Sequence, residues 1–262
     1  MVIAFDIGNT ETVLGLFDGE DLVDHWRIAT RADQTADELG LLVRALVRES
    51  GFDPDDIRAA SIGSVVPHVT SATADMCRAH LGARTLVVDA SVRLPIRLDV
   101  DEPRSVGADR IVNTLAAQHL FRRDTVVVDL GTATTFDCIT RDGVFIGGVI
   151  APGVRTGAQT LVRRTAKLPD VDLQPPPSAI GRRTETAMRA GIFFGAVDAI
   201  DGIVRRLLRE WDRPDALVVA TGGLATVLAP HCSTVHRAEP FITLVGLNLA
   251  LRHVESRERR RR

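Results

Sequence analysis

The sequence of 262 residues predicts an α/β fold made of two similar lobes that face a shared cleft. "DIGNT" (6–10) follows a short apolar run at the start of the chain, and "DLGTATT" (129–135) follows another near its midpoint. Each is succeeded by a second apolar run, an Asp-Gly turn and a third run, and Asp-Gly between such runs is a strong β-hairpin signal. Helical patterns follow both hairpins, so the chain reads as a duplicated unit.

The first half predicts three strands and then alternating helices and strands. Apolar residues at helical spacing predict a helix within 35–51, with Thr35 or Asp37 able to cap its start and Gly51 its end. Residues 57–66 and 84–90 read as buried strands, and 68–81 reads as the helix between them.

The second half repeats this plan from residue 124 onwards. Helices are expected at about 155–165, 184–196 and 197–211, and a further strand ends at 221–223. The proline-rich stretch 168–181 is expected to be a loop. These patterns predict lobes at 1–118 and 119–251 and a disordered, arginine-rich tail at 252–262.

Composition narrows the class of protein. The formal net charge of −2 gives no electrostatic reason for nucleic acid as a partner. Three widely spaced cysteines, Cys77, Cys138 and Cys232, favour reduced thiols over disulfides or a zinc site. No apolar stretch approaches the ~20 residues of a membrane-spanning helix, and a cytoplasmic protein without membrane partners is expected.

The two polar turns have a chemical interpretation. Glycine at positions 8 and 131 allows close approach of a ligand, and neighbouring backbone N–H groups and threonine hydroxyls can donate to phosphate oxygens. The acidic residue at the strand end can hold Mg²⁺ partly through water. One such turn alone would be read as an ordinary turn, but two in matching hairpins, with a late "TGG", favour a polyphosphate site.

Other phosphate-binding classes are excluded. Lys167 is the only lysine, and the sequence has no GxxxxGK[ST] motif, so a P-loop enzyme is excluded. Protein-kinase and Rossmann signatures are also absent, and "GGVIAPG" (147–153) is expected to form a tight turn.

A candidate for handling the phosphoryl acceptor lies in "SVGADRIVNTLAAQHL" (105–120). Gly107 predicts a sharp turn, and Asp109 and Arg110 stand at the start of a helix. Asp109 is either a general base or an acidic residue that stabilises the helix dipole.

Seven segments in this order resemble type III pantothenate kinases over essentially the whole chain. They are "DIGNTETVLGLF", "VGADRIVN", "DLGTATTFD", "GGVIAPG", "RTAKLP", "TETAMRAG" and "TGG". The resemblance implies two RNase H-like lobes of the sugar kinase and actin type and a homodimer. It also implies transfer of the ATP γ-phosphate to pantothenate, the first step of coenzyme A biosynthesis.

The resemblance also assigns roles to residues. Asp109 matches the proton acceptor, and Asp129 matches the ligand of a monovalent cation, potassium or ammonium. Thr184 matches a threonine that reaches the pantothenate of the neighbouring subunit. Asp6 is in addition the expected Mg²⁺ ligand. The nucleotide-contacting positions are Asp6, Ile7, Gly8, Asn9, Thr10, Glu11, Thr12, Val13, Thr132, Thr221, Gly222 and Gly223, and those near pantothenate are Val100, Gly107, Ala108, Asp109, Arg110 and Thr184.

The chain departs from the family pattern just before "VGADR". Many members carry an aromatic residue there, often tyrosine, whereas this chain has no tyrosine and places Val100 at that position. Glu102 and Ser105 also depart from it. A looser pantothenate pocket is therefore expected. The alternative functions are another small-molecule kinase of the same superfamily and a non-catalytic regulator that binds nucleotide or pantothenate.

Overall fold

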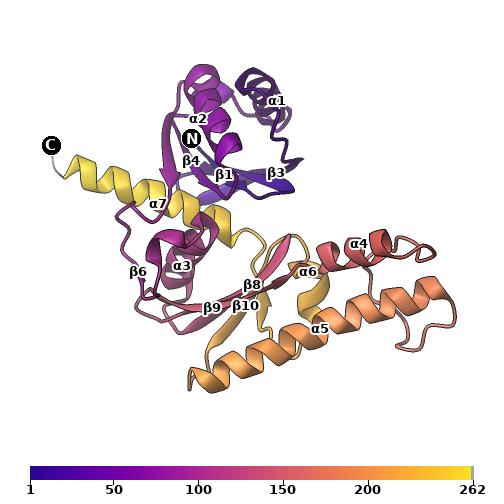
Figure 1. The fold of residues 1–262 in the computed structure, drawn as a ribbon. Coiled ribbons are helices and arrows are strands. Elements are labelled where there is room, and N and C mark those ends of the chain that lie inside the picture. The colour runs from indigo at the N-terminus through magenta and orange to yellow at the C-terminus, as the bar shows by residue number, and fades with distance from the viewer. Residues whose placement is uncertain (261–262) are drawn as a thin grey trace. The chain divides into compact units, whose positions relative to one another are not determined.

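The computed structural model describes residues 1–260 and divides them into two compact units. The first unit contains residues 1–120 together with the C-terminal helix α7 (Ile242–Arg259), and the second contains residues 121–241 (Figure 1). The prediction that one lobe spans 119–251 is therefore wrong at its C-terminal end.

The first unit is built on a sheet with strand order β3-β2-β1-β4-β5. Strands β1 (Val2–Ile7), β2 (Glu11–Asp18) and β3 (Asp21–Ala29) form the antiparallel part, and β4 (Ala59–Ser64) and β5 (Arg84–Val88) add in parallel. Helix α1 (Ala36–Glu49) starts at Thr35 with a capping box, which settles the choice between Thr35 and Asp37. Helix α2 (Pro67–Leu81) connects β4 to β5.

Alternation along β1 divides the first unit into two layers. Ile3, Phe5 and Ile7 pack into a buried cluster with residues of α1 and α2. The side chains between them therefore point to the opposite face, where α7 packs against β1 and β4 (Figure 1). The unit also contains the short strand β6 (Arg97–Leu98), and α3 (Ala108–Phe121) ends at the boundary between the units.

The second unit repeats the same topology. Its strands β7 (Thr125–Leu130), β8 (Ala133–Ile139), β9 (Val144–Pro152), β10 (Leu217–Thr221) and β11 (Arg237–Ala238) run in the order β9-β8-β7-β10-β11. The first three are antiparallel and the last two add in parallel, as in the first unit. The predicted duplication and α/β class are therefore confirmed.

Helices cover the apolar face of this second sheet. Apolar side chains of β7, β8 and β10 pack against α5 (Thr184–Glu210) and α6 (Ala225–Leu228), while α4 (Val154–Arg164) follows β9. Residues 184–210 form one continuous helix rather than the two predicted, because no proline interrupts it and the helix continues through Gly191, Gly195 and Gly202.

Two further predictions are corrected. Residues 147–152 continue strand β9, so "GGVIAPG" is a strand end with Gly153 as the N-cap of α4, not a tight turn. Residues 252–259 belong to α7 and are not disordered, since Arg252 pairs with Glu20 and Arg84 pairs with Glu258. The last two tail residues lie outside the described part of the chain. Within residues 1–260, no helix has the length and apolar character needed to cross a membrane.

Asp201 ties α5 to the segment before β11. Its carboxylate is 6% exposed and accepts hydrogen bonds from the backbone N–H and hydroxyl groups of Ser233 and Thr234. Burial alone would raise the pKa of Asp201, but these hydrogen bonds outweigh it and hold the pKa below its ordinary value.

Replacing Asp201 with alanine should lower the free energy of unfolding by about 2–3 kcal/mol at neutral pH, because the donors of Ser233 and Thr234 lose their acceptor. The pKa of Asp201 is lower in the folded than in the unfolded protein. Its contribution to the free energy of unfolding is therefore fully present above the unfolded-state pKa and is lost as the pH falls through the folded-state pKa. Urea titrations from pH 3 to 7 would measure this. Asp198→Ala, at an exposed position of the same helix, should have little effect. Equal losses in both variants would contradict the prediction.

Candidate active site

The first polar turn joins β1 to β2. The alternation along β1 that buries Phe5 and Ile7 directs Asp6 to the opposite face of the sheet, where it lies in register with Gly63 of β4. The Gly8 N–H donates to the Glu11 carbonyl at 3.0 Å and closes a turn whose tip, Asn9 and Thr10, is exposed. The turn therefore presents backbone and polar side chains to a ligand.

Two of the predicted nucleotide-contacting residues have other roles. The Ile7 side chain is part of the buried cluster beneath α1 and α2. The Thr12 hydroxyl is buried and hydrogen-bonded to the Thr30 hydroxyl at 2.8 Å. Only the backbone of these two residues remains for a ligand. Glu11 forms an ion pair with Arg27 at 2.6 Å, and Val13 lies opposite Asp6 in the hairpin register.

Asp109 lies in the first turn of α3, as the sequence predicted. Its Oδ1 accepts a hydrogen bond from the Arg110 backbone N–H at 2.9 Å, while Ala108 is buried. A Cβ on Gly107 would lie 2.4 Å from the same carboxylate oxygen, so a larger residue there would push the Asp109 side chain out of this position. The same Cβ position is 3.7 Å from Cγ1 of Val65, an exposed residue directly after β4.

Asp6 and Asp109 influence each other electrostatically. Burial, the Asp109 charge and a smaller opposing effect of Arg27 together raise the pKa of Asp6 to about 7. Two carboxylates on one side of a sheet repel each other, and a divalent cation would relieve that repulsion. Among residues 1–260, no group of three or more His, Cys, Asp or Glu side chains is placed to hold a metal ion. This donor set therefore suits Mg²⁺ that takes its remaining ligands from water and phosphate.

The second polar turn joins β7 to β8 and is one residue shorter than the first. The Gly131 N–H donates to the Ala133 carbonyl at 3.0 Å, and Thr132 is exposed. The Thr132 carbonyl accepts from the Gly153 N–H at 3.1 Å and from the Thr156 hydroxyl at 2.8 Å. A Cβ on Gly153 would lie 2.2 Å from that carbonyl oxygen. The glycine thus holds the turn against the N-terminus of α4.

The "TGG" segment lies beside Asp129. Thr221 of β10 is in register with Asp129 of β7, so both side chains emerge on one face of the sheet. Gly222 has φ +85°, and a Cβ there would lie 2.5 Å from the Asp129 Oδ1. The Thr221 hydroxyl is 1% exposed and has no hydrogen-bond partner among the described residues. A carboxylate and a spare hydroxyl oxygen fit a cation. Gly223 follows as an exposed residue.

Asp137 was missed in the sequence analysis. It is 0% exposed and lies in register with Val127, two residues before Asp129, so its side chain shares the face that carries Asp129 and Thr221. The available signal was a charged residue within the otherwise uncharged strand "ATTFDCI". A fully buried carboxylate is costly without a partner and therefore marks a constrained position.

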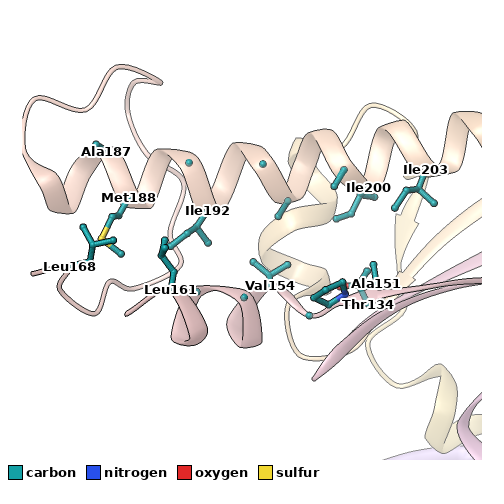
Figure 2. A pocket seen from close by; sticks show the side chains of 18 of the residues that line it. Thr134, Ala151, Val154, Leu161, Leu168, Ala187, Met188, Ile192, Ile200 and Ile203 are labelled. Carbon is teal, nitrogen blue, oxygen red and sulfur yellow. The ribbon is translucent and has the colours of Figure 1, made fainter. Parts of the chain in front are cut away.

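Thr184 lies elsewhere in the second unit, at the first residue of α5. It lines an apolar groove of about 760 Å³ with walls formed by α4 and α5. Figure 2 shows Leu161 and Val154 directed toward Ile192 across this groove, with Met188 and Leu168 near one end. Glycine and alanine residues of both helices make the groove wide.

The structure thus brings the predicted residues together in three groups. Asp6, its turn and the segment 107–110 lie in the first unit, whereas Asp129, Thr132 and 221–223 gather in the second. Thr184 belongs to the groove of the second unit. Val100 follows β6 as a half-buried residue, and the Ser105 hydroxyl donates to the Glu102 carbonyl at 2.7 Å.

Known proteins resemble this chain in sequence and in fold. A type III pantothenate kinase of Moorella thermoacetica is 43% identical over 249 residues, covering 95% of this chain and 98% of the relative. One of Geobacter sulfurreducens is 43% identical over 249 residues, covering 95% and 97%. Among solved structures, a ROK hexokinase from Thermus thermophilus matches with a TM-score of 0.52 at 14% identity, covering 97% of this chain and 99% of that one, which shows a shared two-lobed fold.

The sequence model described as type III pantothenate kinase matches residues 2–206. That match covers both polar turns, the segment around Asp109 and Thr184. By this match and by its near full-length relatives, the chain belongs to the type III pantothenate kinase family.

Proposed function

We propose that this protein phosphorylates pantothenate with ATP, giving 4'-phosphopantothenate, the entry step of coenzyme A biosynthesis. The observation that carries the proposal is the placement of Asp109 at the start of α3, within electrostatic reach of Asp6 and the first polar turn. A base beside a phosphate turn is what transfer to an alcohol requires. Membership of the family supplies the substrate.

The two polar turns bind the β- and γ-phosphates of ATP. The exposed backbone at the tips of the turns, at Asn9 and Thr132, donates N–H groups, and the Thr10 and Thr132 hydroxyls add further donors. The nucleoside lies beside 221–223, where Gly222 has a positive φ, a backbone conformation that glycine adopts without steric cost. The lone lysine plays no part in this scheme, and positioning with electrostatic stabilisation supplies most of the rate.

Asp109 acts as the general base. It orients the primary hydroxyl of pantothenate and takes its proton late, as the bond to phosphorus forms. Gly107 gives the carboxylate the space to turn toward the substrate, while Arg110 and Val100 complete this side of the pantothenate site. Without tyrosine at position 100, the pocket is wider than in members that carry one.

The two cation roles fall to different carboxylates. Asp6 holds Mg²⁺, which offsets the charge of the phosphates when bound. Its pKa of about 7 means that its carboxylate binds the cation better as the pH rises through neutrality. Asp129 and Thr221 hold the monovalent cation, potassium or ammonium.

A homodimer completes the pantothenate site. Thr184 lines the apolar groove between α4 and α5, whose lining includes the exposed Leu161, and clustered exposed apolar side chains are found at interaction sites. In the proposed dimer, Thr184 of one subunit reaches the pantothenate bound by its neighbour.

Asp109→Asn should reduce pantothenate-dependent turnover by about 10²–10⁴-fold, because the amide cannot accept the proton. ADP release by the purified protein with ATP, Mg²⁺, K⁺ and pantothenate measures this. Chelation of Mg²⁺ with EDTA should abolish the wild-type signal. Asp75→Asn, at an exposed residue of α2, is the matched control and should behave as wild type. Wild-type turnover in Asp109→Asn would remove Asp109 from the mechanism, and no pantothenate-dependent ADP from wild type would point to another acceptor or to a non-catalytic regulator.

Asp129→Ala should abolish stimulation by potassium, leaving the rate in KCl equal to that in NaCl. The reason is that the charged ligand of the cation is gone while the other residues of the site are unchanged. Initial rates over a KCl series at constant ionic strength give the answer. Asp124→Ala removes a carboxylate just before the same strand, where it pairs with Arg213 at 3.0 Å, and should keep the potassium response. A potassium response in Asp129→Ala would place the cation elsewhere.

Asp109→Asn and Thr184→Glu subunits should complement each other. A mixed dimer combines Asp109 of one subunit with Thr184 of the other in one of its two sites, so the isolated mixed dimer should recover about half of wild-type turnover and the unsorted co-expressed mixture about a quarter. Tagging the two variants differently allows the mixed dimer to be isolated and assayed. Pairing Asp109→Asn with the double variant gives no intact site and should remain inactive. Failure of the first pair to recover would argue that each subunit works alone.

A further inference from the structure

Helix α7 holds the helix that carries Asp109. It returns to the first unit from the far end of the chain, and a Cβ on its Gly246 would lie 2.1 Å from the Val112 carbonyl oxygen of α3. The two helix backbones are therefore in direct contact. The next residue of α7, Leu247, lies 2.9 Å from the Cβ position of Gly63, which is in register with Asp6. One helix thus packs against both the base-bearing helix and the strand beside Asp6.

One buried side-chain hydrogen bond joins α7 to α3 in this contact. The Thr243 hydroxyl of α7 donates to Oδ1 of Asn113 at 2.9 Å, and the two residues are 6% and 1% exposed. Asn113 is one helical turn after Asp109, so the two side chains lie on the same face of α3.

Loss of this hydrogen bond would displace the Asp109 carboxylate. The Asn113 amide nitrogen is buried and has no hydrogen-bond partner within residues 1–260. Without the Thr243 hydroxyl, the whole buried amide is unsatisfied, and the turn of α3 from 109 to 113 must rotate to find a partner. A rotation of that kind displaces the Asp109 carboxylate, and small displacements of a catalytic group have large effects on rate.

We propose that Thr243 and Asn113 are positioning residues for catalysis, which together set the orientation of Asp109 through the contact between α7 and α3. This inference rests on the proposed role of Asp109. It assigns a function to the C-terminal helix, whose first turn acts on a helix 130 residues earlier in the chain.

The test compares Thr243→Val, which removes the hydroxyl at nearly constant volume, with Thr243→Ser, which keeps it. Thr243→Val should lower kcat about tenfold with the KM for ATP unchanged, and Thr243→Ser should stay within about twofold of wild type. Thr73→Val is the matched control, since Thr73 is a 1% exposed threonine of α2 whose hydroxyl donates to the Val69 carbonyl at 2.8 Å. It should keep the wild-type kcat, with all rates taken at a temperature where every variant is folded.

A double-variant cycle separates positioning from a general loss of structure. If Thr243 acts through Asp109, adding Thr243→Val to Asp109→Asn should slow the enzyme no further than Asp109→Asn alone. The ¹³C signal of the Asp109 carboxyl, assigned by its loss in Asp109→Asn, should shift in Thr243→Val and not in Thr73→Val. This readout needs no turnover, so it stands even if pantothenate is not the acceptor. An unshifted signal, additive effects or a wild-type kcat in Thr243→Val would each overturn the proposal.

Discussion

Alternation of side chains along the two first strands, β1 and β7, is the constraint on which the rest of the structure depends. In β1, Phe5 and Ile7 face the buried layer under α1 and α2, so Asp6 must face the other side of the sheet. In β7, Val128 and Leu130 do the same beneath α5, and Asp129 emerges opposite them. The same alternation therefore forms the core and places the two carboxylates. A shift of β1 or β7 by one residue in register would turn Asp6 or Asp129 into the buried layer.

Close backbone approach is the second constraint, and glycine makes it possible at each site. Gly222 leaves room for the Asp129 carboxylate, and Gly107 does so for Asp109, where a Cβ would lie 2.5 Å and 2.4 Å from the respective oxygen atoms. Gly153 lets the N-terminus of α4 meet the turn at Thr132. These glycines set the distance between the backbone and the neighbouring functional group.

Electrostatics then assigns different work to similar residues. Burial and the charge of Asp109 raise the pKa of Asp6 to about 7. A nearby cation would offset both effects and stabilise the ionised carboxylate. Asp201 has its pKa lowered by the hydrogen bonds of Ser233 and Thr234 and serves only to join α5 to the following segment. Burial is common to both, and the difference comes from the donors around them.

The sequence by itself determined the duplicated hairpins, the two polar turns and the helix start at Asp109, because these features depend on local patterns: Asp-Gly turns, alternation and a glycine before a helix. Only the tertiary structure decided what depends on distant contacts. It placed α7 in the first unit, showed that the Thr12 hydroxyl is occupied by Thr30, and identified Asp137 on the face of Asp129. The bond from Thr243 to Asn113 joins residues 130 positions apart, and no local pattern encodes such a pairing.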